Sequence, residues 1–178
     1  MKMRVIETNV GIQNEVTVEM FDSFARTMRD RGWNGVNSMI ASGLRGGDML
    51  EIGPGPGYVG LEIAKKLTPD SLTGCEISPA MLQFARKNAK NYGIDARYVQ
   101  GNCMEMPFED ESFDSVISNG SLHEWETPVR VFNEIYRVLR PGGRYCITDL
   151  RRNVICWPDT WGWQPQNPGQ SVQDLFPP

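Results

Sequence analysis

The chain has 178 residues, of which 40% are hydrophobic and 22% are charged, so it is long and apolar enough to form one globular domain with a buried core. Its net charge of −4 and its pI near 5.1 argue against a polyanionic partner, and its basic pairs, Lys65-Lys66 and Arg151-Arg152, are too short to follow a row of phosphates. No apolar run approaches the ~18 residues of a membrane span and the N-terminus lacks a signal-peptide core, which predicts a cytoplasmic protein.

Two helical patterns come first along the chain. In the earlier one, apolar residues recur at the spacing of a helix, and the run Arg29–Gly32 ends it. Those apolar residues are Val18, Phe21, Phe24, Ala25 and Met28. The second pattern predicts a shorter helix over Trp33–Ser42. We expect both helices to pack on the sheet that follows.

A strand, a glycine turn and a helix start follow one another over Asp48–Gly60 (DMLEIGPGPGYVG). A short apolar run supplies a buried strand through Met49, Leu50 and Ile52. The glycines that come next allow backbone angles and a close ligand approach that a Cβ would block; they are Gly53, Gly55 and Gly57. The following run, YVGLEIAKKL, opens an amphipathic helix whose first amides face the turn. This corner predicts a small-ligand site, with a tight turn that binds nothing as the alternative.

The spacing of the glycines indicates which ligand to expect. Gly55, Gly57 and Gly60 formally match GxGxxG, the dinucleotide fingerprint, which needs its first glycine directly after the strand. Gly53 holds that place, and Tyr58 stands where the third glycine counted from it would be. The run is therefore better described as acidic-x-Gly-x-Gly-x-Gly.

Four further strand patterns follow. We expect strands at Leu72–Ile77, Ala96–Gln100, Phe113–Ser118 and about 144–149, the last after a helix at about 129–139 and a Pro-Gly-Gly turn. A loop over 119–125 follows the fourth strand. Glu76 lies at the C-terminal end of the second strand, about twenty residues after the glycine turn, and its carboxylate can accept both hydroxyls of a ribose there.

The cysteines predict neither a disulfide framework nor a zinc site. Cys75, Cys103, Cys146 and Cys156 form no CxxC pair, and the chain has one histidine. No metal site is therefore expected. Cys75 and Cys146 fall in predicted strands, where we expect them to be small core residues.

Together these elements resemble the Rossmann-like S-adenosylmethionine-dependent methyltransferases, in particular the small-molecule group related to quinone-ring methylases. The resemblance covers about residues 45–150 through the motifs EIGPGPG, CEISPAML, GNCMEMPFEDESFD and LRPGGR, in the family's order and spacing. It implies a three-layer α/β/α sandwich, parallel strands in the order 3-2-1-4-5, and S-adenosylmethionine as cofactor. The implied organisation is a helical cap over 1–44, a cofactor-binding core over 45–150 and a short Trp/Pro-rich tail over 151–178.

The resemblance also implies cofactor contacts for individual residues. Glu51 and the backbone of the turn would hold the methionine portion through Gly53, Gly55 and Gly57. Glu76 would hold the ribose, and Ile77 would pack on the adenine. From the residues alone, a structural role in bonding neighbouring amides stays open for Glu51, and a helix cap or a surface carboxylate stays open for Glu76.

The loops after the third and fourth strands complete the implied cofactor site. Asn102, Cys103 and Met104 would line the adenine edge, and Asn119 and Gly120 would lie beside the methionine and the reactive methyl. The family usually carries aspartate where Asn102 stands, so a charge-assisted bond to the adenine amino group is replaced by an amide carbonyl.

Transfer from a sulfonium needs alignment and exclusion of water, and it needs a base only when the acceptor is a protonated hydroxyl or amine. His123 is the candidate base, because it follows the fourth strand at the crevice where open α/β sheets bind ligands. Glu124 is the substitute, and a structural histidine is the alternative.

The acceptor is expected to be a small metabolite. The run over 119–122, NGSL, lacks the Asn/Asp-Pro-Pro-aromatic signature of methylases that act on base or amide nitrogens. N-terminal helices of the resembled family commonly help to form the acceptor pocket, so Phe21, Phe24 or Trp33 is expected to touch the substrate.

Residues 151–178 depart from the family, which usually adds a helix, a variable insertion and an antiparallel hairpin after the fifth strand. This segment is rich in Pro and Trp, and it offers one short strand pattern at Val154–Trp157. We expect the hairpin to be absent or reduced, because of a smaller cap, a truncated chain or a changed reading frame. The fifth strand would then be an exposed sheet edge, through which a dimer can form.

Two other classes of function stay open. The missing strands make a noncatalytic S-adenosylmethionine-binding module an alternative to the enzyme. A nicotinamide-dependent oxidoreductase is the third candidate, which the position of Gly53 disfavours.

Overall fold

The computed structural model describes residues 11–12 and 14–149, which form a parallel five-stranded sheet with helices on both faces. The strand order is β3-β2-β1-β4-β5, which confirms the predicted topology. The strands are β1 (Asp48–Ile52), β2 (Ser71–Glu76), β3 (Ala96–Gln100), β4 (Phe113–Asn119) and β5 (Leu139–Thr148). The predicted tail over 151–178, its strand pattern at Val154–Trp157 and Cys156 lie outside the described residues.

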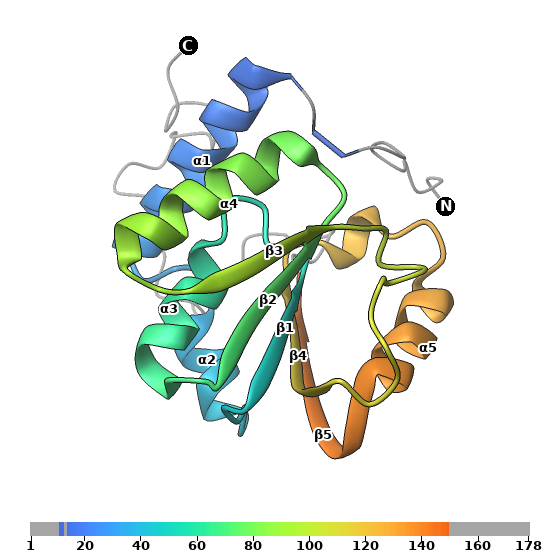
Figure 1. Ribbon diagram of the computed structural model, residues 1–178. Coiled ribbons are helices and arrows are strands. Elements are labelled where there is room, and N and C mark those ends of the chain that lie inside the picture. The colour runs from blue at the N-terminus through green and yellow to red at the C-terminus, as the bar shows by residue number, and fades with distance from the viewer. Residues whose placement is uncertain (1–10, 13, 150–178) are drawn as a thin grey trace, which may run out of the picture.

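The helices divide unequally between the two faces of the sheet. They are α1 (Glu15–Asp30), α2 (Val36–Ala41), α3 (Tyr58–Leu67), α4 (Pro79–Tyr92) and α5 (Pro128–Val138), with a 3-10 helix, η1 (Leu122–Glu124). Figure 1 shows α2, α3 and α4 on one side of the sheet and α5 on the other, with α1 outside α3 and α4. This arrangement is the predicted three-layer α/β/α sandwich.

The central strand β1 shows how its sequence builds both cores. Successive side chains of a strand point to opposite faces, so Met49 joins the cluster beneath α2, α3 and α4. Leu50 and Ile52 join the cluster beneath α5. A parallel strand buried on both faces reads as a nearly continuous apolar run, which is why β1 was predictable.

The helix α4 carries clear start and stop signals. The Ser78 hydroxyl accepts a hydrogen bond from the Met81 amide at 3.2 Å, Pro79 occupies the first turn, and Gly93 ends the helix in the left-handed conformation. Because α4 begins directly after β2, its start lies at the same edge of the sheet as the glycine turn.

Two expectations about element boundaries are wrong, and a third, about packing, follows below. Helix α2 begins at Val36 rather than at Trp33, because Gly35 in the left-handed conformation separates the two. Trp33 is 48% exposed. Strand β5 begins at Leu139 rather than near 144, and the Pro-Gly-Gly segment is an irregularity within its pairing to β4.

The third correction concerns α1, whose apolar stripe does not face the sheet. Helix α1 packs on α3 and α4, with Val18 fully buried, while Phe21 and Phe24 remain 40% and 39% exposed. The buried side also contains Asp22, whose carboxylate accepts hydrogen bonds from the Tyr58 hydroxyl at 3.0 Å and the Asn88 amide at 3.1 Å. Buried polar contacts to other helices therefore determine the orientation of α1.

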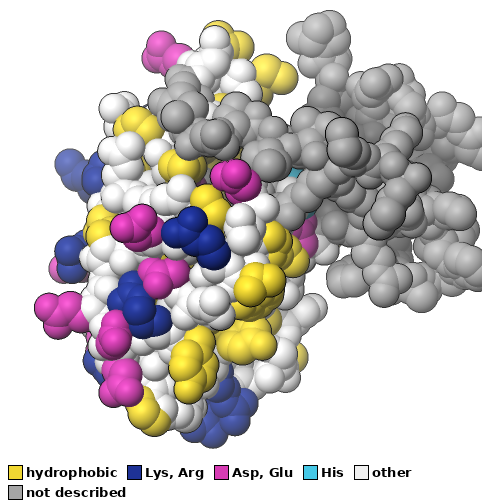
Figure 2. Space-filling view, turned by 90° about the vertical axis from the view of Figure 1, so that its right-hand side faces the viewer, with side chains coloured by type: hydrophobic (Ala, Val, Ile, Leu, Met, Phe, Trp, Pro, Cys, Tyr) yellow, Lys and Arg dark blue, Asp and Glu magenta, His cyan; other side chains and the backbone are white. Residues whose placement is uncertain are grey.

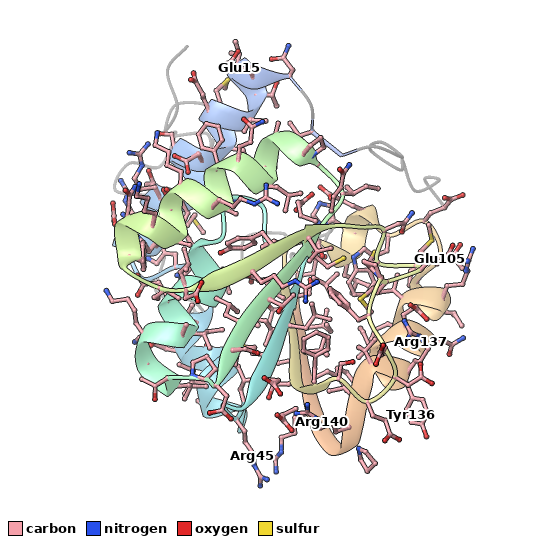
Figure 3. All side chains as sticks on the ribbon, viewed as in Figure 1. Glu15, Arg45, Glu105, Tyr136, Arg137 and Arg140 are labelled. Atoms are coloured by element: carbon pink, nitrogen blue, oxygen red, sulfur yellow. The ribbon has the colours of Figure 1, made fainter. Side chains whose placement is uncertain are left out.

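Charged and apolar surface features mark the side of the sheet that carries β5. Arg140 forms ion pairs with Asp48 at 2.9 Å and Asp114 at 2.7 Å, and it lies at the lower end of the sheet in Figure 3. These pairs join the amino ends of β1 and β4. Exposed apolar side chains gather over α5 and β5 (Figure 2); they include Val129, Phe132, Tyr136 and Tyr145.

Candidate functional site

Several predicted site residues meet at the carboxyl ends of β1, β2 and β4. Strand β1 lies between β2 and β4, so the glycine turn after β1 stands between Glu76 at the end of β2 and the loop after β4. The strand order reverses between β1 and β4, and open α/β sheets bind ligands at the carboxyl ends of the strands beside such a reversal.

The glycine turn is closely packed by its neighbours. A Cβ on Gly53 would lie 2.9 Å from the Ser121 Cβ, and a Cβ on Gly57 would lie 2.7 Å from the Tyr98 hydroxyl. Both glycines also have positive φ angles, of +62° and +86°. Larger residues are therefore excluded here by the backbone conformation and by packing.

Gly60 is needed for a different structural reason. A Cβ at this position in α3 would lie 2.2 Å from the Glu51 Oε2 atom. Gly60 thus makes room for a buried carboxyl group, and its backbone N–H donates a 3.2 Å hydrogen bond to Glu51 Oε1. The formal GxGxxG match through Gly60 follows from this packing.

Glu51 points from β1 toward the first turn of α3. It is 2% exposed, and its Oε2 atom has no hydrogen-bond partner among the described residues. Burial raises the pKa of Glu51 to about 8, the Gly60 N–H opposes that shift, and the nearby Glu76 adds to it. The side chain therefore supports the turn from below, and its second oxygen is the one left to receive another donor.

Glu76 is placed differently, although it is also largely buried at 7% exposure. Its Oε2 accepts the Gly55 N–H at 3.1 Å, and its Oε1 accepts the Ser78 N–H at 2.9 Å. Burial raises the pKa of Glu76, and these backbone donors oppose the shift. Each carboxylate oxygen has a second lone pair, so the group can still accept both hydroxyls of a ribose.

The N-terminal segment lies against this corner. A Cβ on Gly55 would be 3.3 Å from the Phe21 ring, and one on Gly11 would be 2.7 Å from Ile77. The Ser78 hydroxyl donates a hydrogen bond to the Ile12 carbonyl. Helix α1 and the residues before it therefore border the position predicted for the cofactor.

The two other predicted acceptor contacts, Phe24 and Trp33, have neighbours within or just after α1. Phe24 packs on Phe21 with ring centroids 6.2 Å apart, whereas Trp33 pairs with the Arg31 guanidinium at 4.9 Å. Gly35, two residues after Trp33, lies near Asn119, because a Cβ added to Gly35 would be 3.5 Å from the Asn119 Oδ1 atom.

The loop after β3 is held by its own contacts and by α5. Asn102 Oδ1 accepts the Met104 N–H at 2.9 Å, while Cys103 and Met104 pack against the apolar cluster that contains Cys75. Burial raises the pKa of Cys103 to about 11 and that of Cys75 to about 12, so both thiols stay protonated near neutral pH. Cys75 is a core residue as predicted, whereas Cys146 is half-buried.

An ion pair on α5 fixes the same loop and was not predicted. Arg137 donates to the Phe108 carbonyl at 2.7 Å and to the Met106 carbonyl at 3.1 Å, and Glu134 accepts the Met106 N–H at 2.7 Å. Figure 3 shows Arg137 between α5 and this loop. The hydrogen bond from Arg137 lowers the pKa of Glu134.

The loop after β4 places Asn119, Gly120 and His123 near the end of β5. Asn119 Oδ1 accepts the Thr148 hydroxyl at 2.6 Å, and the Gly120 N–H donates to the Thr148 carbonyl at 2.8 Å. These bonds keep the start of the loop close to the sheet. His123 follows in η1.

His123 is paired with Asp149, a residue that the sequence did not single out. The His123 backbone N–H donates to Asp149 Oδ2 at 2.8 Å, and the ring Nδ1 lies 2.9 Å from Oδ1. With Nδ1–H as the donor, the imidazole lone pair is on Nε2. Glu124 Oε1 lies 3.8 Å from Nε2. The sequence signal that could have identified Asp149 is its position directly after β5, the neighbour of β4.

This set of groups fits a nucleoside-bearing ligand. Glu76 offers a carboxylate for a diol, the glycine turn offers close approach to backbone, and the His123–Asp149 pair places an imidazole at the same edge of the sheet. An open hollow of about 370 Å³ is lined by other residues, from 42–44 and 143–146. Within 11–12 and 14–149, no helix is long and apolar enough to cross a membrane.

Comparisons with known proteins point to one family. The model of the methyltransferase domain matches residues 50–147. An uncharacterized methyltransferase of Bacillus subtilis is 34% identical over 115 residues, which are 65% of this chain and 62% of that protein. A phthiotriol/phenolphthiotriol dimycocerosates methyltransferase of Mycobacterium tuberculosis is 36% identical over 116 residues, which are 64% of this chain and 42% of that protein.

A solved structure agrees with the family match. A protein of Methanococcus maripaludis, assigned as an S-adenosyl-L-methionine-dependent methyltransferase, superposes with a TM-score of 0.70 at 27% identity. The match covers 80% of this chain and 67% of that one. The chain spans 62% and 42% of the lengths of the two curated relatives, which is less than two thirds in each case.

Proposed function

Because the chain belongs to the methyltransferase domain family, we propose that it transfers a methyl group from S-adenosylmethionine to a small-molecule acceptor. The observation that carries the proposal is Glu76, which stands beside Gly55 at the end of β2 with acceptor capacity for a ribose diol. The fold match to S-adenosylmethionine-dependent enzymes supports the same cofactor.

The proposed cofactor site follows the carboxyl edge of the sheet. Glu76 binds the ribose, and the backbone of the glycine turn borders the methionine portion. Ile77, Cys103 and Met104 offer apolar contact to the adenine. Asn102 has one amide carbonyl, already bonded to the Met104 N–H, whose second lone pair faces the adenine amino group in this proposal.

Glu51 acts on the cofactor through the turn. Its contact with the Gly60 N–H supports the start of α3, and its Oε2 atom is available to an ammonium group that reaches it. The structural role and the methionine-binding role of Glu51 are therefore compatible. Only the methionine-binding role predicts that the protonation of Glu51 changes when the cofactor binds.

The chemistry supplied by bound S-adenosylmethionine is a methyl group that its sulfonium has already activated. The chain's part is to hold the acceptor in line and to exclude water. For a hydroxyl or amine acceptor, His123 Nε2 takes the proton as the new bond to the methyl forms. Asp149 holds the ring in the tautomer with the lone pair on Nε2 and stabilises the imidazolium that results.

A small molecule is the proposed acceptor class. Relatives include the enzyme named for phthiotriol and phenolphthiotriol dimycocerosates and a rice enzyme named for 2-methyl-6-phytyl-1,4-hydroquinone. The net charge of −4 also disfavours a nucleic acid acceptor. Phe21, 40% exposed beside the glycine turn, is the aromatic residue best placed to contact an apolar part of the acceptor.

Transfer of a tritiated methyl group tests the proposal. The chain is incubated with methyl-labelled S-adenosylmethionine and a cell extract separated into small molecules, proteins and nucleic acids. We expect label in a small molecule, with a reaction without the chain as control. Label only in the macromolecular fractions would contradict the acceptor class. Cofactor binding without any transfer would favour the noncatalytic module.

A further inference from the structure

A row of hydrogen bonds connects the loop after β4 to the end of β1. The Trp125 indole N–H donates to Ser121 Oγ at 3.1 Å, Ser121 Oγ lies 2.6 Å from Ser118 Oγ, and Ser118 Oγ donates to the Ile52 carbonyl at 2.9 Å. All four residues are buried. These hydrogen bonds are therefore shielded from water, and a donor or acceptor that lost its partner here would destabilise the protein.

The direction of every bond in this row follows from the available protons. A serine hydroxyl has one proton, and Ser118 uses its proton on the Ile52 carbonyl. The short contact between the two hydroxyls must therefore be donated by Ser121, whose lone pair in turn accepts the Trp125 N–H. Each donor has an acceptor, so the row has one arrangement and resists reorientation.

The two ends of the row lie on the two parts of the proposed site. Ile52 is the last residue of β1 and precedes Gly53. Ser121 and Trp125 are the residues that flank η1, the turn that carries His123. Ser121 also lies beside the turn, because a Cβ added to Gly53 would be 2.9 Å from the Ser121 Cβ.

We propose that Ser121 is a positioning residue that holds His123 at a set distance from the glycine turn, through its bonds to Ser118 and Trp125. The inference rests on the proposed methyl transfer. Asp149 orients the imidazole from the side of β5, and the row through Ser121 holds the same loop from the side of β1. A displacement of about 1 Å between reacting groups can lower a rate by about 10²-fold, so a small shift of η1 matters.

The variant Ser121→Ala isolates this role. It keeps the Cβ next to Gly53 and removes only the hydroxyl, so the Trp125 N–H loses its acceptor and Ser118 Oγ loses the bond from Ser121, while Ser118 still donates to the Ile52 carbonyl. Ser115→Ala is the matched control, because Ser115 is a buried serine on β4 whose hydroxyl donates to the Arg45 carbonyl at 2.9 Å and is not part of the row. Ser115 pairs with Met49, near the other end of β1.

The single histidine of the chain provides a readout that needs no acceptor. Nitrogen-15 spectra of the untagged protein contain one imidazole, that of His123. We expect one sharp set of ring signals in the wild type and in Ser115→Ala, and exchange-broadened or doubled signals in Ser121→Ala. Sharp, unshifted signals in Ser121→Ala would overturn the proposal. Trp125→Phe removes the first donor of the row and serves as the second variant if Ser121→Ala does not fold.

Kinetics with an acceptor from the labelling screen provide the second readout. We expect Ser121→Ala to lower kcat by about tenfold to a hundredfold, with affinity for S-adenosylmethionine changed less than twofold. In a His123→Ala background the same change should lower kcat no further. An equal loss in Ser115→Ala, or a further tenfold loss in the His123→Ala background, would show a general structural effect and contradict the proposal. If the wild type transfers no methyl group, the proposed function fails, and the imidazole spectra still decide the role of Ser121.

Discussion

Replacing Glu51 with glutamine should make the protein more stable at neutral and alkaline pH. Glu51 is almost completely buried, with one oxygen bonded to the Gly60 N–H and the other without a hydrogen-bond partner among the described residues. Ionising such a group inside the protein is unfavourable, because little compensates for the lost hydration. Glutamine keeps the size and an acceptor oxygen for Gly60, and it cannot ionise.

The size of the effect follows from the pKa. Burial raises the pKa of Glu51 from 4.5 to about 8 in the folded protein. At about 1.36 kcal/mol per pKa unit, this shift corresponds to roughly 5 kcal/mol. Below about pH 4.5 the carboxyl is protonated in both states. Between pH 4.5 and 8 only the unfolded chain loses the proton, so the wild type loses stability as the pH rises, and above pH 8 the loss is complete.

Urea unfolding of both proteins between pH 4 and pH 9 measures this effect. The free energy of unfolding of Glu51→Gln minus that of the wild type should rise with pH by several kcal/mol and level off near pH 8. Glu76, whose pKa is also raised, is present in both proteins and largely cancels in the difference. A difference that stays constant from pH 5 to pH 9 would refute the reasoning, because Glu51 would then titrate alike in both states.

Three further substitutions test the site. Gly60→Ala should lower the free energy of unfolding by about 3 kcal/mol or more, because its Cβ would lie 2.2 Å from Glu51 Oε2; in a Glu51→Ala background the loss should be much smaller, and an unaffected Gly60→Ala protein would contradict the packing. Glu76→Ala should weaken binding of S-adenosylmethionine about tenfold to a hundredfold by calorimetry, through loss of hydrogen bonds worth roughly 1.5–3 kcal/mol, and unchanged affinity in a folded variant would rule out the ribose assignment. His123→Ala should lower the transfer rate by about 10²-fold or more and leave cofactor affinity nearly unchanged; a variant that keeps its rate would show that His123 is structural.

The sheet was predictable because its signals are local. Strand β1 has the apolar run that a buried strand requires, and Gly53 follows it. Strand β3 lies at the edge of the sheet, where only Tyr98 is buried, and Gly101 follows it. The order of the strands followed from the family's motifs, which appear in the expected sequence along the chain. Glu76 was also visible, because it is the last residue of a strand that follows the glycine turn.

The polar contacts that orient α1 and His123 were not predictable in this way. Asp22 reads as a residue of the solvent-facing side of α1, yet it is buried by Tyr58 and Asn88, which lie 36 and 66 positions away in the sequence. Asp149 meets His123 across 26 positions, because β4 and β5 bring their ends together. Local periodicity carries no information about such pairs, since they depend on the assembled sheet.

The central claim is that the carboxyl edge of the sheet binds S-adenosylmethionine, and calorimetric titration tests it most directly. The wild-type chain is titrated in separate experiments with S-adenosylmethionine, with its demethylated product and with NAD. The structure and the family predict saturable one-site binding of the first two ligands and no binding of NAD. Binding of NAD without binding of S-adenosylmethionine, or binding of none of the three by the folded protein, would contradict the claim.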